Sequence, residues 1–326
     1  MGLPQPRWRC SRSATQPSGG SARPREGAGV TEVEPEGGPT VGRMLIGSTL
    51  RRLRTEKGIT REEAADAIRA SAWKIHRLEN GQVGFKDRDL VDLLGLYGVT
   101  DQEGVAALLE LSREANSPGW WFRYGDLVPP WFRTYMDLEA AATLIRTYQA
   151  QLVPGLLQTA DYARATIAGM LLPRSPEEVE RRVTLRLARQ QILEKPDGPR
   201  LWAVVDEAAL RRPVGGEEVM REQLERLIDA ANLPSVVLQV LPVSVGAHSA
   251  MAGAFSILRF ADRELPDIVY IEHLTNAHYL DKLDDVNQYL HVIDSISMHA
   301  APPGKTVEIL HQILKEFSST PPAGRR

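Results

Sequence analysis

Basic side chains are concentrated in one stretch of the sequence. From Arg51 to Arg77 there are eight Lys or Arg residues against four Asp or Glu, and from Leu78 to Ala115 there are three against eight. Lys and Arg gathered on one face bind nucleic-acid phosphates, whereas a helical bundle with a purely structural role has no need of such a polarity. The first half of this region is therefore predicted to carry a DNA-binding face.

A second group of polar residues has the types found in catalytic or metal sites: Asp206, Glu207, His248, Glu272, His273 and His278. Glu272 and His273 are adjacent on a predicted strand, so their side chains are expected on opposite faces. The sequence contains no His-Glu-x-x-His, no Cys pair, no Gly-x-Ser-x-Gly and no phosphate-binding glycine loop. We therefore predict no enzyme activity, no cofactor and no metal. A cavity near His248 and Glu272 that binds a small effector is an open alternative.

The properties of the whole chain limit the class of protein. Its 326 residues are enough for two domains, and 43% hydrophobic with 25% charged residues is typical of a globular protein. No apolar run reaches the roughly 18 residues that cross a membrane, and Cys10 is the only cysteine. A cytoplasmic location is expected. The formal net charge of −3 argues against a protein that coats nucleic acid indiscriminately.

Residues 1–43 are predicted to be a disordered tail, and residues 319–326 a second, shorter one. The first segment is dense in Gly, Pro, Ser and Arg and has hardly any spaced apolar residues. Such a segment buries too little surface to offset its conformational entropy. Its arginines could bind DNA phosphates nonspecifically. The simpler interpretations are an uninvolved tail or a translation start at Met44.

The elements that position the basic face are helices. Apolar residues recur at helical spacing from Met44 onward and predict an all-α, five-helix domain over residues 44–115. Gly58 is a stop signal after the first helix. Residues 87–97 and 102–115 are predicted to form the fourth and fifth helices.

The second and third helices are short and joined by a tight turn. Thr60 and Glu63 form a capping box that starts the second helix, and Ser71 is the N-cap of a third that runs to about Asn80. Two such helices cross steeply, so the later one can enter the major groove of DNA. One groove-binding helix covers only a half-site, and we therefore expect a homodimer on an inverted-repeat operator.

The third helix has one apolar side and one polar side. Ile75 and Leu78 are predicted to point inward and to share a core with Ala65 and Ile68 of the second helix. The residues left facing outward are Ala72, Trp73, Lys74, His76 and Arg77. These side chains are predicted to face the double-stranded DNA.

The stretch from Thr60 to Gly81, which ends in Leu-Glu-Asn-Gly, resembles the helix-turn-helix of the Cro/lambda-repressor superfamily. This superfamily is also called the xenobiotic-response-element type. The resemblance implies a lambda-repressor-like fold in which Ala72, Trp73 and Lys74 face bases. It thereby favours a transcriptional regulator.

The same resemblance assigns further residues to DNA. It implies that Arg77 and Asn80 lie near the backbone or the groove edge, and that Arg61 clamps a phosphate beside the N-terminus of the second helix. The complete set of predicted DNA-binding residues is Arg61, Ser71, Ala72, Trp73, Lys74, His76, Arg77 and Asn80.

Two residues depart from the family pattern. Arg69 stands in the turn where members usually have Gly, so a left-handed backbone conformation there would be strained. Trp73 stands where members often carry a small polar residue. A Trp can pack on a thymine methyl or a sugar, but it cannot form the bidentate contacts of Arg or Gln.

The chain after the helices is predicted to form an aromatic-rich connection and an α+β domain. The connection, residues 116–135, is expected to dock two domains, because a freely swinging linker would be Gly/Ser-rich. The α+β domain covers residues 136–318. Its predicted helices are 137–149, 154–170, 176–194, 217–231, 281–299 and 306–317, and its predicted strands are 201–205, 236–241, 255–260 and 268–272.

The second half is similar to the C-terminal region of a large actinobacterial regulator group, in which this helix-turn-helix is fused to a domain of unassigned function. The matching segments are 130–135, 145–148, 152–163, 205–216, 246–253 and 269–273. Members look like antitoxin-type or developmental regulators that act with a small partner protein. The resemblance implies a platform for a partner protein or for an unknown small-molecule effector.

Three hypotheses follow. The first is a sequence-specific transcriptional regulator whose C-terminal domain senses a ligand or a protein. The second is an antitoxin-like protein that sequesters a small partner and regulates its own expression. The third, weaker one is an enzyme built on the α+β domain, which predicts either stoichiometric metal or activity that depends on His248.

Overall fold

The structure is a computed structural model that describes residues 41–319 except 100, 118, 171–174 and 263–264. Most of the two predicted tails, residues 1–43 and 319–326, lies outside the described residues. The inner ends of both tail predictions were wrong, because helix α1 (Val41–Glu56) begins before Met44 and helix α12 (Pro303–Ser319) includes the first residue of the second tail. Among the described residues no helix is long and apolar enough to span a membrane.

The N-terminal region is helical. Its helices after α1 are α2 (Arg61–Ala67), α3 (Ala72–Glu79), α4 (Asp87–Leu96) and α5 (Gln102–Asn116). They enclose a core that includes Ile46, Ile75 and Leu90, each at most 1% exposed. Local signals set the helix ends: Gly58 and Gly81 both have positive φ angles, which glycine adopts without the steric cost of a side chain.

A close approach fixes α3 against α1. A Cβ atom at Gly47 would lie 2.5 Å from the carbonyl oxygen of Leu78, well inside van der Waals contact. Only glycine therefore allows these two helices to meet at their observed separation. This contact holds the C-terminal end of α3 against the body of the helical region.

The C-terminal region is built on a six-stranded mixed sheet with the strand order β3-β2-β1-β4-β5-β6. The strands are β1 (Leu144–Gln149), β2 (Arg200–Asp206), β3 (Val236–Leu241), β4 (Phe255–Arg259), β5 (Ile268–Glu272) and β6 (Ala277–Leu280). β1, β2 and β3 are parallel, whereas β4, β5 and β6 continue the sheet in antiparallel pairs. β1 joins the two halves, because it pairs in parallel with β2 and antiparallel with β4.

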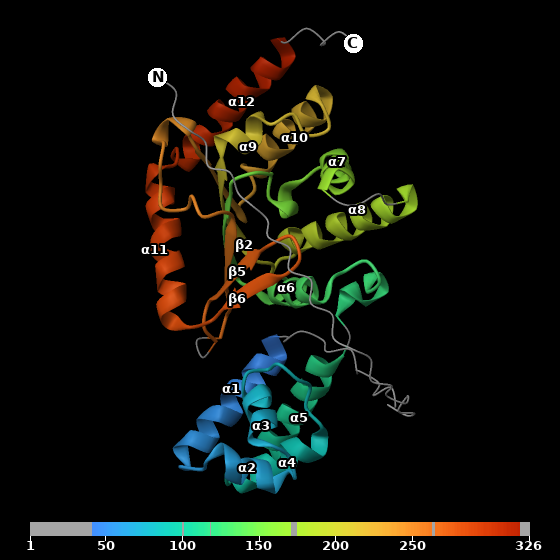
Figure 1. The fold of residues 1–326 in the computed structure, drawn as a ribbon, viewed down its shortest axis with the longest axis vertical. Coiled ribbons are helices and arrows are strands. Elements are labelled where there is room, and N and C mark those ends of the chain that lie inside the picture. The colour runs from blue at the N-terminus through green and yellow to red at the C-terminus, as the bar shows by residue number, and fades with distance from the viewer. Residues whose placement is uncertain (1–40, 100, 118, 171–174, 263–264, 320–326) are drawn as a thin grey trace, which may run out of the picture. The chain divides into compact units, whose positions relative to one another are not determined.

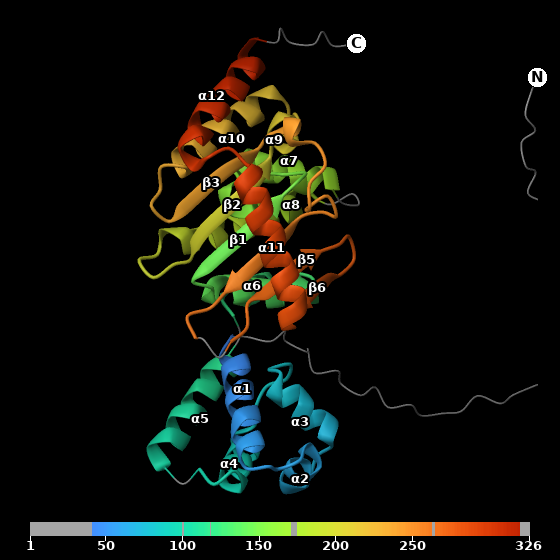
Figure 2. The same ribbon diagram turned by 90° about the vertical axis from the view of Figure 1, so that its left-hand side faces the viewer.

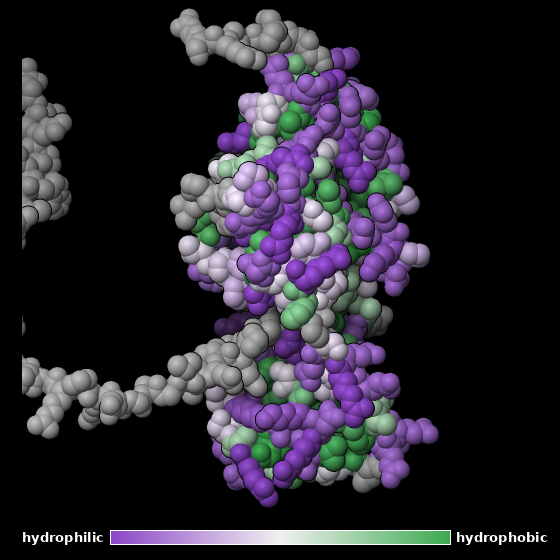
Figure 3. Space-filling model, turned by 90° about the vertical axis from the view of Figure 1, so that its right-hand side faces the viewer, coloured by the Kyte–Doolittle hydropathy of each residue, from purple (hydrophilic) through white to green (hydrophobic). Residues whose placement is uncertain are grey.

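Helices cover both faces of this sheet (Figures 1 and 2). On β2, Leu201, Ala203 and Val205 pack on one side, while Val204 packs on the side covered by α11 (Leu283–His299). This alternation is the period of two expected of a strand buried on both faces. Figure 3 shows one face of the molecule, on which hydrophobic residues form small groups among hydrophilic ones.

The other helices of this region precede β1 or connect the parallel strands. They are α6 (Pro130–Ala141), α7 (Ala160–Met170), α8 (Pro176–Gln190), α9 (Glu207–Arg211) and α10 (Glu217–Ala230). Short 3-10 segments cover Trp120–Tyr124, Gly155–Leu157, Gln191–Glu194 and Val243–Val245. The parallel strands are linked through α7 and α8 and then through α9 and α10, as crossover connections require.

The main error of the sequence prediction lies at residues 144–149. They were assigned to a helix over 137–149, but they form β1, while α6 ends at Ala141. Leu138, Ala142 and Ile145 have the spacing of a helical face, and this pattern concealed the β-forming run Ile145 to Tyr148. β6 was also missed, because four residues are too short for a periodic signal.

The aromatic-rich connection is packed. Trp121 and Tyr124 lie in a cluster with Leu127, Met136 of α6 and Leu185 of α8. Trp121 Nε1 also donates a hydrogen bond to Asp137 at 2.7 Å. The end of the connection was placed too late, since α6 begins at Pro130.

Candidate nucleic-acid interface

Capping residues set the limits of the two helices that form the candidate interface. The Thr60 hydroxyl accepts a hydrogen bond from the Glu63 backbone N–H, and the Glu63 carboxylate accepts one from the Thr60 N–H at 2.7 Å. The hydrogen bonds that the Thr60 N–H and, next, the Thr60 hydroxyl donate to the Glu63 carboxylate lower the pKa of Glu63. Ser71 caps α3 by accepting from the Lys74 N–H. Both predicted N-caps are thus confirmed.

The turn between α2 and α3 contains strained backbone. Arg69 has φ +54°, and it is the only non-glycine residue with positive φ in the described part of the chain. This region is costly for residues with a Cβ atom, by roughly 1–2 kcal/mol. The conformation that the sequence predicted to be strained at Arg69 is present.

Arg69→Gly is expected to stabilise the α2–α3 unit by about 1 kcal/mol, because glycine adopts positive φ without the steric penalty. Hydrogen exchange of the α2 and α3 amides in the full chain measures the gain. Arg69→Ala is the matched control, since it removes the same charge but keeps the Cβ atom. Equal stabilisation by both variants would show that charge, and not backbone strain, limits stability at this position.

A buried carboxylate joins the helices behind the candidate interface. The side chain of Glu79 is only 1% exposed and pairs with Arg54 of α1 and with Arg61 Nε at 3.0 Å. Arg54 also donates to the Ile59 carbonyl oxygen at 2.7 Å. Burial, and next the charge of Glu79, raise the pKa of Tyr97 to about 12. Glu79, within the Leu-Glu-Asn-Gly ending, therefore holds α1, α2 and α3 together.

The outward face of α3 combines an aromatic side chain with polar ones. The side chain of Trp73 is 65% exposed and stacks on the His76 ring, with centroids 5.2 Å apart and planes 26° apart. Asn80 Nδ2 donates to the His76 carbonyl oxygen at 2.9 Å and lies within 3.3 Å of the ring nitrogens. The inward residues Ile75 and Leu78 are buried, as the sequence predicted.

Two of the predicted DNA contacts are already engaged in ion pairs. Lys74 Nζ lies 2.6 Å from Asp89 of α4, and its side chain is 37% exposed. Arg61 pairs with Glu79 through Nε, and the Arg61 side chain is 41% exposed. Ser71 is exposed, whereas Ala72 and Arg77 are half-buried. Sequence reasoning did not anticipate these pairs, because their partners lie on other helices.

The residues singled out for catalysis fall into separate groups. Tyr148 Oη lies 3.3 Å from Asp206 and 3.4 Å from His248 Nε2, at the carboxyl ends of β1 and β2. Asp206 also caps α9 through the Ala208 N–H, and His248 Nδ1 accepts from the Ala250 N–H. Among the described residues no three His, Cys, Asp or Glu side chains are grouped as a metal site.

Of the remaining candidates, Glu272, His273 and His278 lie around the β5–β6 hairpin, whereas Glu207 begins α9. β5 ends at Glu272, as predicted for this strand, so His273 lies beyond it and the expectation that Glu272 and His273 are adjacent on a strand was wrong. The His273 and His278 rings meet edge to face with centroids 5.2 Å apart. Glu207 has a structural role, because it forms an ion pair with Arg211 and accepts a hydrogen bond from the Val243 N–H.

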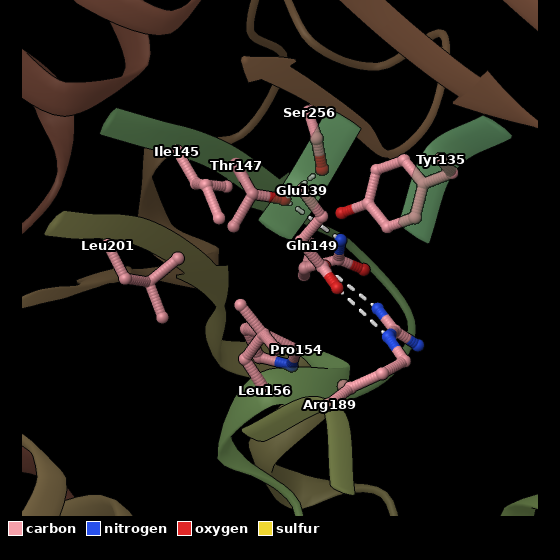
Figure 4. A pocket seen from close by; sticks show the side chains of 11 residues that line it. Tyr135, Glu139, Ile145, Thr147, Gln149, Pro154, Leu156, Arg189, Leu201 and Ser256 are labelled. Atoms are coloured by element: carbon pink, nitrogen blue, oxygen red, sulfur yellow. Dashed lines mark hydrogen bonds and ion pairs between the residues drawn. The ribbon is translucent and has the colours of Figure 1, made fainter. Parts of the chain in front are cut away.

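A small polar cavity lies beside β1 (Figure 4). Its volume is about 40 Å³, enough for two or three water molecules and far below the roughly 300 Å³ of a drug-sized site. Neither His248 nor Glu272 lines it, so it is not the effector cavity left open by the sequence. The lining residues are Tyr135, Glu139, Ile145, Thr147, Gln149, Pro154, Gly155, Leu156, Arg189, Leu201 and Ser256.

A buried ion pair forms the polar wall of this cavity. Arg189 of α8 donates two hydrogen bonds to Glu139 of α6, at 2.9 and 2.8 Å, with side chains 8% and 2% exposed. Burial lowers the pKa of Arg189, but the Glu139 carboxylate outweighs this effect and the net shift is upward. Burial, and next Arg189, lower the pKa of Arg186 to about 10. Sequence reasoning missed this pair because its members are 50 residues apart.

Comparison with known proteins identifies both regions. A model described as a helix-turn-helix domain matches residues 45–112, and a model described as a domain of unknown function (DUF5753) matches residues 132–312. No curated protein and no solved structure matches significantly. The first match places the α2–α3 unit in a DNA-binding domain. Because the second covers more than half of the chain, the protein belongs to the DUF5753 family and carries an N-terminal helix-turn-helix domain.

Proposed function

We propose that this protein is a sequence-specific transcriptional regulator of the Cro/lambda-repressor type that binds an inverted-repeat operator as a homodimer. The α2–α3 unit carries the proposal: it lies within the helix-turn-helix match and directs polar and aromatic side chains outward from α3. In such units the later helix enters the major groove.

The charges around α3 support phosphate contacts. Lys74 and Arg77 are three residues apart and thus share a helix face. Arg51 and Arg69 are exposed and have no ion-pair partner among the described residues. Lys74 must exchange Asp89 for a phosphate when DNA binds, so that Lys74 keeps a counter-charge while the Asp89 carboxylate gives up its pair with Lys74.

The double variant Lys74→Ala with Arg77→Ala is expected to weaken operator binding at least about 100-fold, because each protomer loses two contacts worth roughly 1–3 kcal/mol each. The operator is first obtained by selection from random DNA with the full chain. Binding is then measured by gel shift across a salt series, in which the slope of log K against log salt should fall with each lost phosphate contact.

The matched control is Arg88→Ala with Arg113→Ala. It removes the same formal charge from the helical region, at side chains that are exposed and lie outside α3. This control should keep operator affinity within a few-fold. If the Lys74/Arg77 variant binds the operator normally at physiological salt, α3 is not part of the DNA interface. Sedimentation of the protein–DNA complex tests whether the protein binds as a homodimer.

We further propose that the sheet domain is a non-catalytic, metal-free platform for a small partner protein or a small-molecule effector, as in antitoxin-like regulators. Its support is that Asp206, Glu207 and His248 are engaged in helix caps, backbone contacts and a hydrogen-bond cluster. Mass spectrometry of protein purified from its native cell tests this role. If the domain has this role, a protein or small molecule should be bound to the purified chain, and its removal should change operator affinity.

A further inference from the structure

The first turn of α3 presents an apolar surface where a DNA-reading helix would meet bases. Ala72 and Trp73 begin this helix, and the Trp73 side chain is 65% exposed. By contrast, Tyr97 of the same helical region is 1% exposed. An aromatic ring of this size left in water loses roughly 2 kcal/mol of burial free energy relative to a core position. Its position on the outer face of α3 therefore leaves this apolar surface available to a partner.

Contacts along α3 hold the indole in place. Trp73 stacks on His76, one turn further along the helix, and Asn80 lies against the His76 ring. A side chain that is already ordered loses little conformational entropy when it binds. The indole is therefore a prepared contact surface.

The polar side chains next to the indole in the sequence are engaged elsewhere in the free protein. Lys74 is paired with Asp89 at 2.6 Å, and Ser71 is engaged as the N-cap of α3. The indole itself has a single donor and no acceptor, so it cannot make the bidentate hydrogen bonds that distinguish guanine or adenine. What the first turn of α3 offers to the major groove is mainly apolar.

We propose that Trp73 is a specificity-determining residue that reads thymine, by packing its indole against the C5-methyl group in the major groove. This methyl is the apolar group by which the major groove distinguishes a T·A pair from the other pairs. Ala72, which precedes Trp73 in the same turn, is a second apolar side chain there. The inference rests on the proposed DNA-binding function and adds the base and the chemical group that α3 recognises.

The experiment removes the methyl group from the DNA and the indole from the protein. Each thymine of the selected operator is replaced in turn by deoxyuracil, which keeps the base pair and lacks only the methyl. Replacement of one particular thymine in one half-site should lower operator affinity about fourfold, equivalent to one buried methyl group at ~0.8 kcal/mol. Replacement of the equivalent thymine in both half-sites should lower it about 15-fold. With Trp73→Ala the same replacements should change affinity less than about 1.5-fold.

A gain of function complements this loss. Cytosine at the identified position should bind more weakly than 5-methylcytosine, which restores a C5-methyl, and Trp73→Ala should abolish the difference. Val91→Ala is the matched protein control, because it removes an exposed apolar side chain from α4 and should leave the uracil effect unchanged.

The possible outcomes are distinct. Failure of the wild type to select any operator contradicts the proposed function before uracil is introduced. Specific binding that tolerates uracil at every thymine overturns the reading of thymine by Trp73. An equal uracil penalty in wild type and Trp73→Ala also overturns it, as does a Trp73→Ala variant that loses affinity only because its oligomeric state changes.

Discussion

Arg189→Met should lower the free energy of unfolding of the full chain by about 3–5 kcal/mol, because it leaves the Glu139 carboxylate buried without a counter-charge. Arg189 also lies over the rings of Phe132 and Tyr135, with its guanidinium carbon 4.8 and 5.6 Å from their centroids. The substitution therefore removes cation–π contacts together with the ion pair. Urea denaturation followed by far-ultraviolet circular dichroism measures the effect.

Two further variants separate the ion pair from general damage to α8. Arg181→Met lies on the same helix, but its pair with Asp126 is exposed, with side chains 48% and 59% accessible. Exposed pairs contribute about 0–1 kcal/mol, so this variant should be nearly neutral. Glu139→Leu combined with Arg189→Met should recover most of the lost stability, because it removes both buried charges. A double variant as unstable as Arg189→Met alone would contradict the electrostatic explanation.

Glu79→Gln should destabilise the helical region by about 2–3 kcal/mol, since hydrogen bonds to charged groups contribute roughly 1.5–3 kcal/mol. Gln keeps the shape of Glu but leaves the guanidinium groups of Arg54 and Arg61 without a counter-charge. Arg54 is the more affected, because its side chain is 12% exposed. Faster hydrogen exchange in α1, α2 and α3 of the full chain is the expected readout.

Glu56→Gln is the control for this prediction. Glu56 pairs with Arg52 one turn away on α1, with side chains 58% and 48% exposed, and the pair should contribute little. The control should leave exchange in the three helices unchanged. Slow, wild-type exchange in Glu79→Gln would mean that packing at Gly47 and Leu78, and not the buried carboxylate, determines the stability of this unit.

Features determined by neighbouring residues could be predicted from the sequence. The capping box at Thr60, the N-cap at Ser71 and the strained backbone at Arg69 each depend on contacts within a few residues. Four strands were also recognised, because β-branched runs bounded by turn residues have a local signature.

Features determined by partners far away in the sequence could not be predicted. β1 carries a helix-compatible spacing, and only its pairing with β2 and β4 makes it a strand. The Arg189–Glu139 pair and the polar cavity beside it need α6, α8 and the sheet to be in place. In the helical region, the partners of Lys74 and Arg61 lie on α4 and α3, so the sequence could not show that these two basic side chains are ion-paired in the free protein.

The position of β1 at the junction of the two halves of the sheet has a consequence for how the chain folds during synthesis. The Ser256 hydroxyl donates to Thr147 across the β1–β4 pair, and these residues are 109 positions apart. Contacts of such length form slowly, whereas the helical region is closed by shorter-range contacts and can fold as it leaves the ribosome. Until β4 has been made, one edge of β1 is an open template for other strands. We therefore expect the nascent chain to carry a folded helical region before its sheet is protected, and truncations that end before residue 255 should aggregate through the sheet domain.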